Sequence, residues 1–217
     1  MAQTAVRSRR TNRDDRATAG VEGNSRLTAT TGVLLLVLLA VEGVTVLQVR
    51  RLITLHVYLG LILLGPVALK TASTVYRFAR YYTGSAPYVR KGPPHVVLRW
   101  LGPVVIVTSL TLLASGVVLV VQPTGDEGIW LAVHKVSFIL WFGAMTIHVL
   151  GHLREALLGA YDELRTASRG RLARLAVLVL SLALGVAVAA AVYPSASGWT
   201  SHHGELREGP APAGARP

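Results

Sequence analysis

Five apolar runs, each about as long as a membrane span, dominate this sequence of 217 residues. A helix needs roughly 20 mostly apolar residues to cross the hydrocarbon core of a bilayer. Hydrophobic residues make up 52% of the chain and the mean hydropathy is +0.48, which is too apolar for an ordinary soluble domain. The sequence therefore predicts an all-α, polytopic membrane helix bundle. Its five transmembrane helices are expected at about residues 28–47, 53–75, 97–121, 129–153 and 172–192.

The segments between these runs suggest the domain organisation. We expect a disordered, Arg-rich tail over residues 1–27 and a disordered Pro/Gly/Ala-rich tail over residues 194–217. The first four apolar runs, residues 28–153, are expected to form a four-helix core. A basic cytoplasmic loop, 154–171, then leads to the fifth transmembrane helix, 172–193.

The formal net charge of +11 is distributed as in membrane proteins. Arg and Lys residues cluster in the 76–99 and 154–174 segments, whereas the 122–128 segment carries only acidic charges. Cytoplasmic loops of membrane proteins are rich in Lys and Arg, so we expect a cytoplasmic amino terminus and no nucleic-acid partner. Arg50 and Arg51 lie in an outer turn, against this rule. The chain has no cysteine, which excludes disulfides, thiolate metal sites and iron–sulfur clusters.

Histidines recur at one spacing in the apolar runs. His134 and His148 are fourteen residues apart in the fourth run, close to four helical turns, so they share a helix face about 21 Å apart. The second run carries His56, and the position fourteen residues further on is Lys70. The predicted topology makes these two helices parallel, with His56 level with His134 and Lys70 level with His148.

This pattern matches the needs of a b-type haem, which takes two axial donors on opposite sides of a flat macrocycle in an apolar slot. His56 and His134 would bind the iron of an outer haem. Arg50 and Arg51 are expected to pair with its anionic propionates. In the alternative interpretation, each histidine only hydrogen-bonds a neighbouring helix.

Other polar residues in the runs leave alternatives open. Lys70 is an iron ligand only when deprotonated, and otherwise extends its charge to water or pairs with a propionate. An inner haem could instead use His148 or His152 with another donor such as His95, although His152 is better explained as a surface residue. Glu42 either exchanges protons at a quinone site or, as we favour, pairs with Arg50 or Arg51.

The pattern resembles the membrane cytochrome b superfamily. Its members include the amino-terminal four-helix half of the cytochrome b of quinol–cytochrome c reductase, the haem subunits of formate dehydrogenases and ferric-reductase-like proteins. In the first of these, the second and fourth helices each carry two histidines separated by thirteen residues. Here His134 and His148 match that pattern, whereas the second helix matches only at His56, because Lys70 replaces the other histidine. Gly102 and Gly116 have the spacing of glycines that admit haems in that family.

The resemblance, over about residues 28–153, implies haem b (one or two) and transmembrane electron transfer between a quinone pool and a redox partner. We expect the electron-transfer subunit of an oxidoreductase, with a soluble or peripheral partner, rather than a stand-alone enzyme. Abundant Arg, Ala, Val and Leu favour a bacterial plasma membrane. The alternatives are a metal transporter, with His56, His134 and His148 as ligands, and a haem-free structural or assembly subunit.

Overall fold

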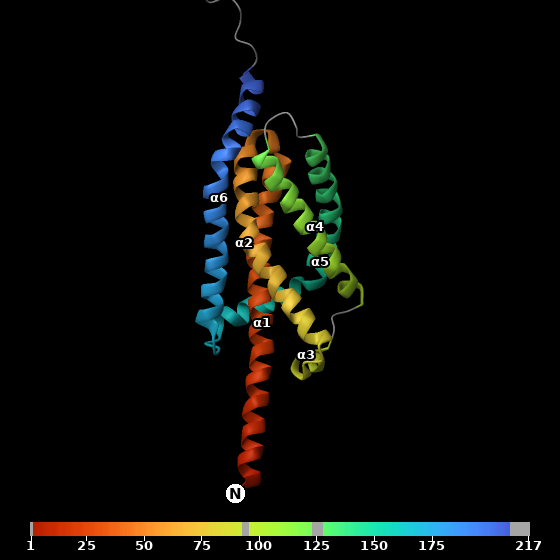
Figure 1. Ribbon diagram of the computed structural model, residues 1–217, viewed down its shortest axis with the longest axis vertical. Helices are drawn as coiled ribbons and strands as arrows, with labels where there is room; N and C mark the ends of the chain where they lie inside the picture. The colour runs from red at the N-terminus through yellow and green to blue at the C-terminus, as the bar shows by residue number, and fades with distance from the viewer. Residues whose placement is uncertain (1, 93–95, 123–127, 209–217) are drawn as a thin grey trace, which may run out of the picture.

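The computed structural model describes residues 2–92, 96–122 and 128–208, with side chains for 18–92, 96–122 and 128–195. These residues form an all-α helical bundle, as the sequence predicts (Figure 1). The helices are α1 (Ala2–Leu47), α2 (Val49–Tyr82), α3 (Ala86–Lys91), α4 (Val96–Val121), α5 (Gly128–Arg165) and α6 (Arg171–Glu208).

All the helices except the short α3 contain a segment long and apolar enough to cross a membrane. These segments are Thr18–Leu47, Val49–Tyr82, Val96–Val121, Gly128–Arg165 and Arg171–Ser195. Many of their large apolar side chains point away from the bundle: Trp100, Ile139 and Leu180 are each more than two-thirds exposed. A surface of this kind is stable when lipid tails cover it. The chain is therefore a multi-pass membrane protein, which confirms the prediction.

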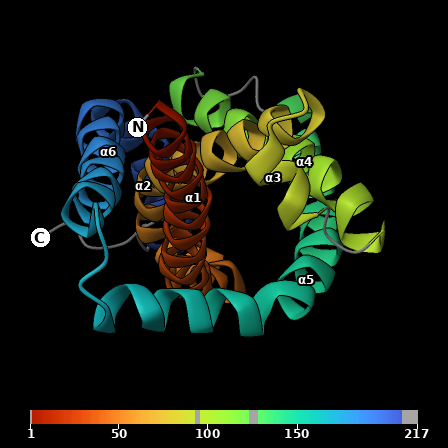
Figure 2. The ribbon, with the colours of Figure 1, turned by 90° about the horizontal axis from the view of Figure 1, so that it is seen from below.

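The helices form two walls. Helices α1 and α2 pack together on one side and α4 and α5 on the other, as the view along the bundle shows (Figure 2). Helix α6 packs mainly on α2. We call the end with the Gln48 turn between α1 and α2 the upper end, and the end with α3 the lower end, as they lie in Figure 1.

Two glycines allow α6 to pack closely on α2. A Cβ atom at Gly65 of α2 would collide with the backbone of Ser181 in α6. A Cβ atom at Gly185 of α6 would collide with the backbone of Ile62 in α2. Membrane helices use small residues in this way, because lipid tails give no hydrophobic driving force for helix association. The contact between α2 and α6 therefore depends on both glycines.

The terminal segments differ from the prediction of disorder. Helix α1 begins at Ala2, so the backbone of residues 2–27 is helical. Extension of an existing helix costs far less than nucleation of a new one, and tertiary contacts also support this segment. The Asn24 side chain donates to the Ser73 carbonyl at 3.2 Å, and the Thr28 hydroxyl donates to the Ser73 hydroxyl at 3.1 Å. Helix α6 likewise continues past Pro194 to Glu208.

The predicted basic loop 154–171 is wrong over most of its length, because α5 continues to Arg165. The last part of α5 runs across the bundle and passes alongside α1, partway along the length of that helix (Figures 1 and 2). At the crossing, a Cβ atom on Gly159 would lie only 2.8 Å from the Cβ of Ala29. Charged residues in this segment suggested a loop, but it also buries Ala160 and Glu163 against the bundle.

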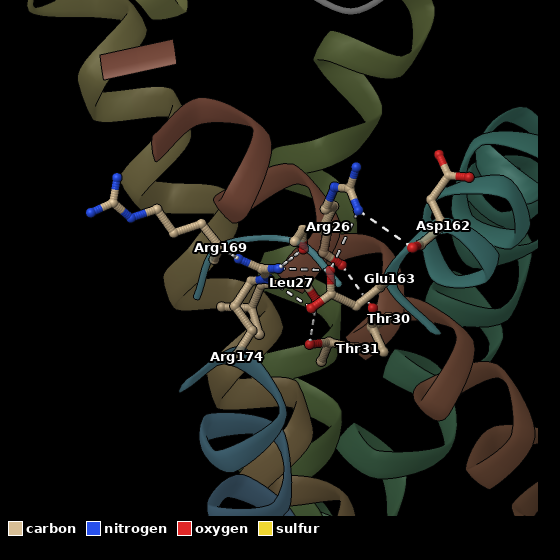
Figure 3. Close-up of polar contacts among 9 residues, drawn as sticks. Arg26, Leu27, Thr30, Thr31, Asp162, Glu163, Arg169 and Arg174 are labelled. Atoms are coloured by element: carbon tan, nitrogen blue, oxygen red, sulfur yellow. Dashed lines mark hydrogen bonds and ion pairs between the residues drawn. The ribbon is translucent and has the colours of Figure 1, made fainter. Parts of the chain in front are cut away.

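A buried carboxylate holds this crossing helix in place. Glu163 of α5 is 1% exposed and accepts two hydrogen bonds of 2.8 Å from the Arg174 guanidinium of α6. Arg26 of α1 lies 3.8 Å from the same carboxylate. Figure 3 shows the two guanidinium groups converging on Glu163 from different helices. The cluster therefore joins α1, α5 and α6 at the lower end.

Candidate functional site

A cavity of about 1260 Å³ lies between the α1–α2 wall and the α4–α5 wall. It is larger than the roughly 300–1,000 Å³ of an ordinary small-molecule site. Its lining is mostly apolar and extends from Arg51 near the upper end to Ala156 near the lower end. The side chains that line it include every site residue suggested by the sequence: His56, His134, His148, Lys70, Arg50 and Arg51.

His56 of α2 and His134 of α5 face each other in the upper half of this cavity. Their ring centroids are 6.4 Å apart and their planes make an angle of 82°. The two residues come from opposite walls and are separated by 78 positions in the chain. The parallel arrangement of these helices, inferred from charge alone, thus places the two imidazoles at the same depth.

The Gln48 turn brings a carboxylate onto the His56 ring. Oε1 of Glu42 lies 2.8 Å from Nδ1 of His56, and the Glu42 side chain is only 12% exposed. The Thr45 hydroxyl donates to the other Glu42 oxygen at 3.0 Å and lies 3.1 Å from the same ring nitrogen. A carboxylate acceptor on Nδ1 places the proton there and leaves the Nε2 lone pair free.

The His134 ring is oriented by neutral groups of α4. Its Nδ1 lies 3.1 Å from the Leu112 carbonyl and 3.1 Å from the Ser115 hydroxyl. A carbonyl oxygen only accepts, so Nδ1 carries the proton and Nε2 keeps its lone pair. Gly116 gives the ring room, because a Cβ atom there would approach Cε1 of His134 to 3.3 Å.

The paired histidines fit the axial positions of a haem. With a metal–nitrogen bond of about 2 Å, two imidazoles on opposite sides of one metal have centroids roughly 6 Å apart, and the observed distance is 6.4 Å. Both rings keep Nε2 free, as iron ligation requires. Two glycines, Gly60 of α2 and Gly116 of α4, line the same part of the cavity, where they leave space for Glu42 and His134.

Three cations line the upper part of the cavity: Arg50 and Arg51 beside the Gln48 turn, and Lys135 on α5. None of them forms an ion pair with a carboxylate among the described residues. They are therefore available to anionic groups, and guanidinium groups bind carboxylates especially well. The prediction that Glu42 pairs with Arg50 or Arg51 is wrong, since its carboxylate contacts His56 instead.

The lower half of the cavity is arranged differently. Lys70 is not paired with a histidine ring as His56 is. Its ammonium donates to the Thr28 carbonyl of α1 at 2.7 Å. Gly32 makes space for it, because a Cβ atom there would lie 3.0 Å from Nζ. Nδ1 of His148, in contrast, is buried and has no hydrogen-bond partner in the described part of the chain.

The sequence suggested two further histidines for an inner haem, His152 and His95. His152 is partly exposed and lies 3.3 Å from the Glu155 carboxylate, in keeping with a residue near the bundle surface. Its ring also lies 4.9 Å, between centroids, from that of His148. His95 is outside the described residues. Within the described residues, no group of three His, Cys, Asp or Glu residues is arranged to hold a metal ion.

Sequence reasoning missed the groups that orient the two histidines. Glu42 and His56 lie six positions before and eight after Gln48, so a reversal at that residue places them side by side. The short gap between the first two apolar runs was the available signal. Ser115 gave no such signal, because its pairing with His134 depends on how α4 and α5 pack.

Comparison of the chain with protein-family models, with curated proteins and with solved structures returns no match.

Proposed function

We propose that this protein is an integral membrane b-type cytochrome that holds one haem between His56 and His134 and carries electrons. The observation that supports this most strongly is the opposed pair of imidazoles, 6.4 Å apart, each with Nδ1 on an oxygen acceptor. Histidines that only joined helices would not need an apolar cavity of about 1260 Å³ around their free nitrogens. The resemblance to membrane cytochromes b points the same way.

The chain's own residues have distinct roles in this proposal. His56 and His134 bind the iron, Glu42 and Ser115 orient them, and Arg50 and Arg51 pair with the propionates. When bound, haem would supply a one-electron couple. The apolar walls exclude water from the iron and so influence its reduction potential.

Haem content tests the proposal directly. Protein purified after expression with sufficient haem is expected to show a Soret band, a low-spin reduced spectrum and at least one haem per chain by the pyridine haemochrome assay. His134→Ala and His56→Ala should each lose the haem of this site. His152→Ala is the matched control, since it removes a histidine of α5 that pairs with Glu155. A wild-type protein without a Soret band, or an unchanged haem content in His134→Ala, would refute the proposal.

We also propose that the lower end faces the cytoplasm of a bacterial plasma membrane. The lower end carries residues 76–92 and the connection between α5 and α6, residues 165–174, and each of these segments has four Arg or Lys residues and no acid. Because the chain lacks cysteine, single cysteines report topology cleanly. In intact cells, a membrane-impermeant maleimide should label Gln48→Cys and spare Ser85→Cys, and the reverse pattern would invert the orientation.

The electron partners follow from this topology. A haem near the upper end lies closer to the outer surface, where a quinone or a redox subunit can exchange electrons with it. Mixing the reduced protein with an oxidised water-soluble quinone analogue should reoxidise the haem in a stopped-flow experiment. If the haem stays reduced over minutes, the quinone pool is not the partner, and a protein subunit is the remaining choice.

A further inference from the structure

The lower half of the cavity holds a cation that forms no ion pair with a carboxylate among the described residues. Each described carboxylate in an ion pair is engaged elsewhere: Glu42 with His56, Glu155 with His152, and Glu163 with Arg174 and Arg26. Lys70 lies on the cavity wall within a membrane span and has no such partner. Charged side chains inside a membrane are costly and are usually paired or functional.

The Lys70 ammonium makes one hydrogen bond within the described part of the chain, which leaves most of its donor capacity unused. An ammonium group has three N–H donors, and the Thr28 carbonyl, 2.7 Å away, accepts one of them. That carbonyl is neutral, so it does not balance the charge. Gly32 allows the ammonium to pack against α1 at the edge of the cavity, which fixes where an anion would bind.

A second polar group lies on the opposite wall. Nδ1 of His148, on α5, is buried without a hydrogen-bond partner. His148 and Lys70 both line the cavity, from opposite walls. Buried polar atoms are nearly always hydrogen-bonded, so an unsatisfied nitrogen on a side chain that lines the cavity indicates that this histidine takes a polar partner from a bound molecule. The surrounding lining is apolar and includes Val105, Met145 and Val149.

We propose that the lower half of the cavity is a separate binding site for an apolar molecule that carries a carboxylate. The carboxylate pairs with Lys70 and accepts a hydrogen bond from His148, while the apolar body lies along the cavity. This site does not depend on the pair of His56 and His134. Its carboxylate can come from a membrane fatty acid or from the propionate of a second haem.

The test compares a charged probe with its neutral form. The purified full-length chain is titrated with spin-labelled stearic acid and with its methyl ester, and the immobilised fraction is measured by electron paramagnetic resonance. A charge-assisted pair should make the acid bind about tenfold or more tightly than the ester. Equal binding of acid and ester to a protein with no second haem would overturn the proposal, and this comparison needs no variant.

Variants assign the effect to Lys70. Lys70→Gln should abolish the preference for the acid, and Lys70→Arg should retain most of it. Lys91→Gln is the matched control, because Lys91 is also a lysine at the lower end but does not line the cavity. A preference for the acid that persists in Lys70→Gln would overturn the role of Lys70. A retained Soret band in Lys70→Gln verifies folding and keeps this test separate from that of the His56 and His134 haem.

Haem content identifies the source of the carboxylate. Two haems per chain in the wild type and one in Lys70→Gln would show that the anion is a haem propionate, and the spin-labelled acid would then be excluded from the site. One haem in both proteins, with preferential binding of the acid, would show that the site takes a membrane fatty acid. Two haems in both proteins would overturn the proposal, because Lys70 would then hold no anion.

Discussion

Glu42 and His56 lie on the two sides of the Gln48 turn, and Oε1 of the carboxylate is 2.8 Å from Nδ1 of the imidazole. The opposite histidine, His134, has only neutral partners, the Leu112 carbonyl and the Ser115 hydroxyl. The two proposed iron ligands therefore differ in the group that contacts Nδ1, which is a carboxylate for His56 and neutral oxygens for His134. A carboxylate raises the basicity of a ligating histidine more than a neutral acceptor does.

Replacement of Glu42 by Gln should raise the haem reduction potential and weaken haem binding. Glutamine retains an acceptor for His56 but removes the negative charge, so the ligand donates less strongly to ferric iron. Loss of such a partner typically weakens metal binding by about 10–100-fold. Redox titration and competitive transfer of haem to apomyoglobin measure the two effects.

Ser115→Ala is the control for this change. It removes one partner of His134 but leaves the Leu112 carbonyl, so it should shift the potential less than Glu42→Gln does. If the two variants behave alike, the charge on Glu42 has no special role at the site.

Gly116→Ala should disturb the same site from the α4 side. The added methyl group would lie 3.3 Å from Cε1 of His134, so the ring must tilt away from its present position. We expect a lower haem content and a broadened low-spin signal in the electron paramagnetic resonance spectrum. Gly43→Ala, where a Cβ atom meets nothing within 4 Å, should leave both unchanged and so controls for the helix propensity of alanine.

Substitution of Gly65 or Gly185 by Ala should weaken the fold without touching the cavity. Each added methyl group would collide with the backbone of the partner helix, so α2 and α6 must separate. The loss in unfolding free energy should be about 3 kcal/mol or more, at or beyond the usual upper cost of overpacking. Unfolding in sodium dodecyl sulfate, followed by circular dichroism, measures it. Stability equal to that of Gly43→Ala would contradict the close crossing.

Arg174→Ala should also be strongly destabilising. It leaves Glu163, which is 1% exposed, without its closest cation, and removal of one partner from a buried pair costs about 3–5 kcal/mol. Arg26→Ala should cost about 1 kcal/mol or less, because Arg26 is partly exposed and 3.8 Å from the carboxylate. The same unfolding assay ranks the two variants, and an equal loss would mean that both cations neutralise Glu163.

The spans could be predicted because lipid imposes length and hydropathy on each helix separately. The relation of His56 to His134 also followed from sequence, since charge sets the direction of each helix and residue number sets the depth along it. Neither argument reports which side chains touch. The partner of Glu42 therefore depended on the geometry of the Gln48 turn, and that of His134 on the packing of α4 against α5.

The predictions that were wrong concern residues where a helix continues beyond its apolar run. Residues 154–165 are charged enough to suggest a loop, yet they form a helix that buries Glu163. Hydropathy does not show such burial, because the compensating charge, Arg174, is on another helix. Lys70 raises the same difficulty, because its hydrogen bond to the Thr28 carbonyl depends on how α2 packs against α1.

The Glu163 cluster also sets an order of events during synthesis. The carboxylate leaves the ribosome before Arg174, and α6 contributes no residue to the described lining of the cavity. A partly made chain can thus have all four helices that line the cavity, while its Glu163 carboxylate still lacks Arg174. Docking of the last span supplies that partner, so this helix completes the molecule by neutralising a charge at its base rather than by closing the cavity.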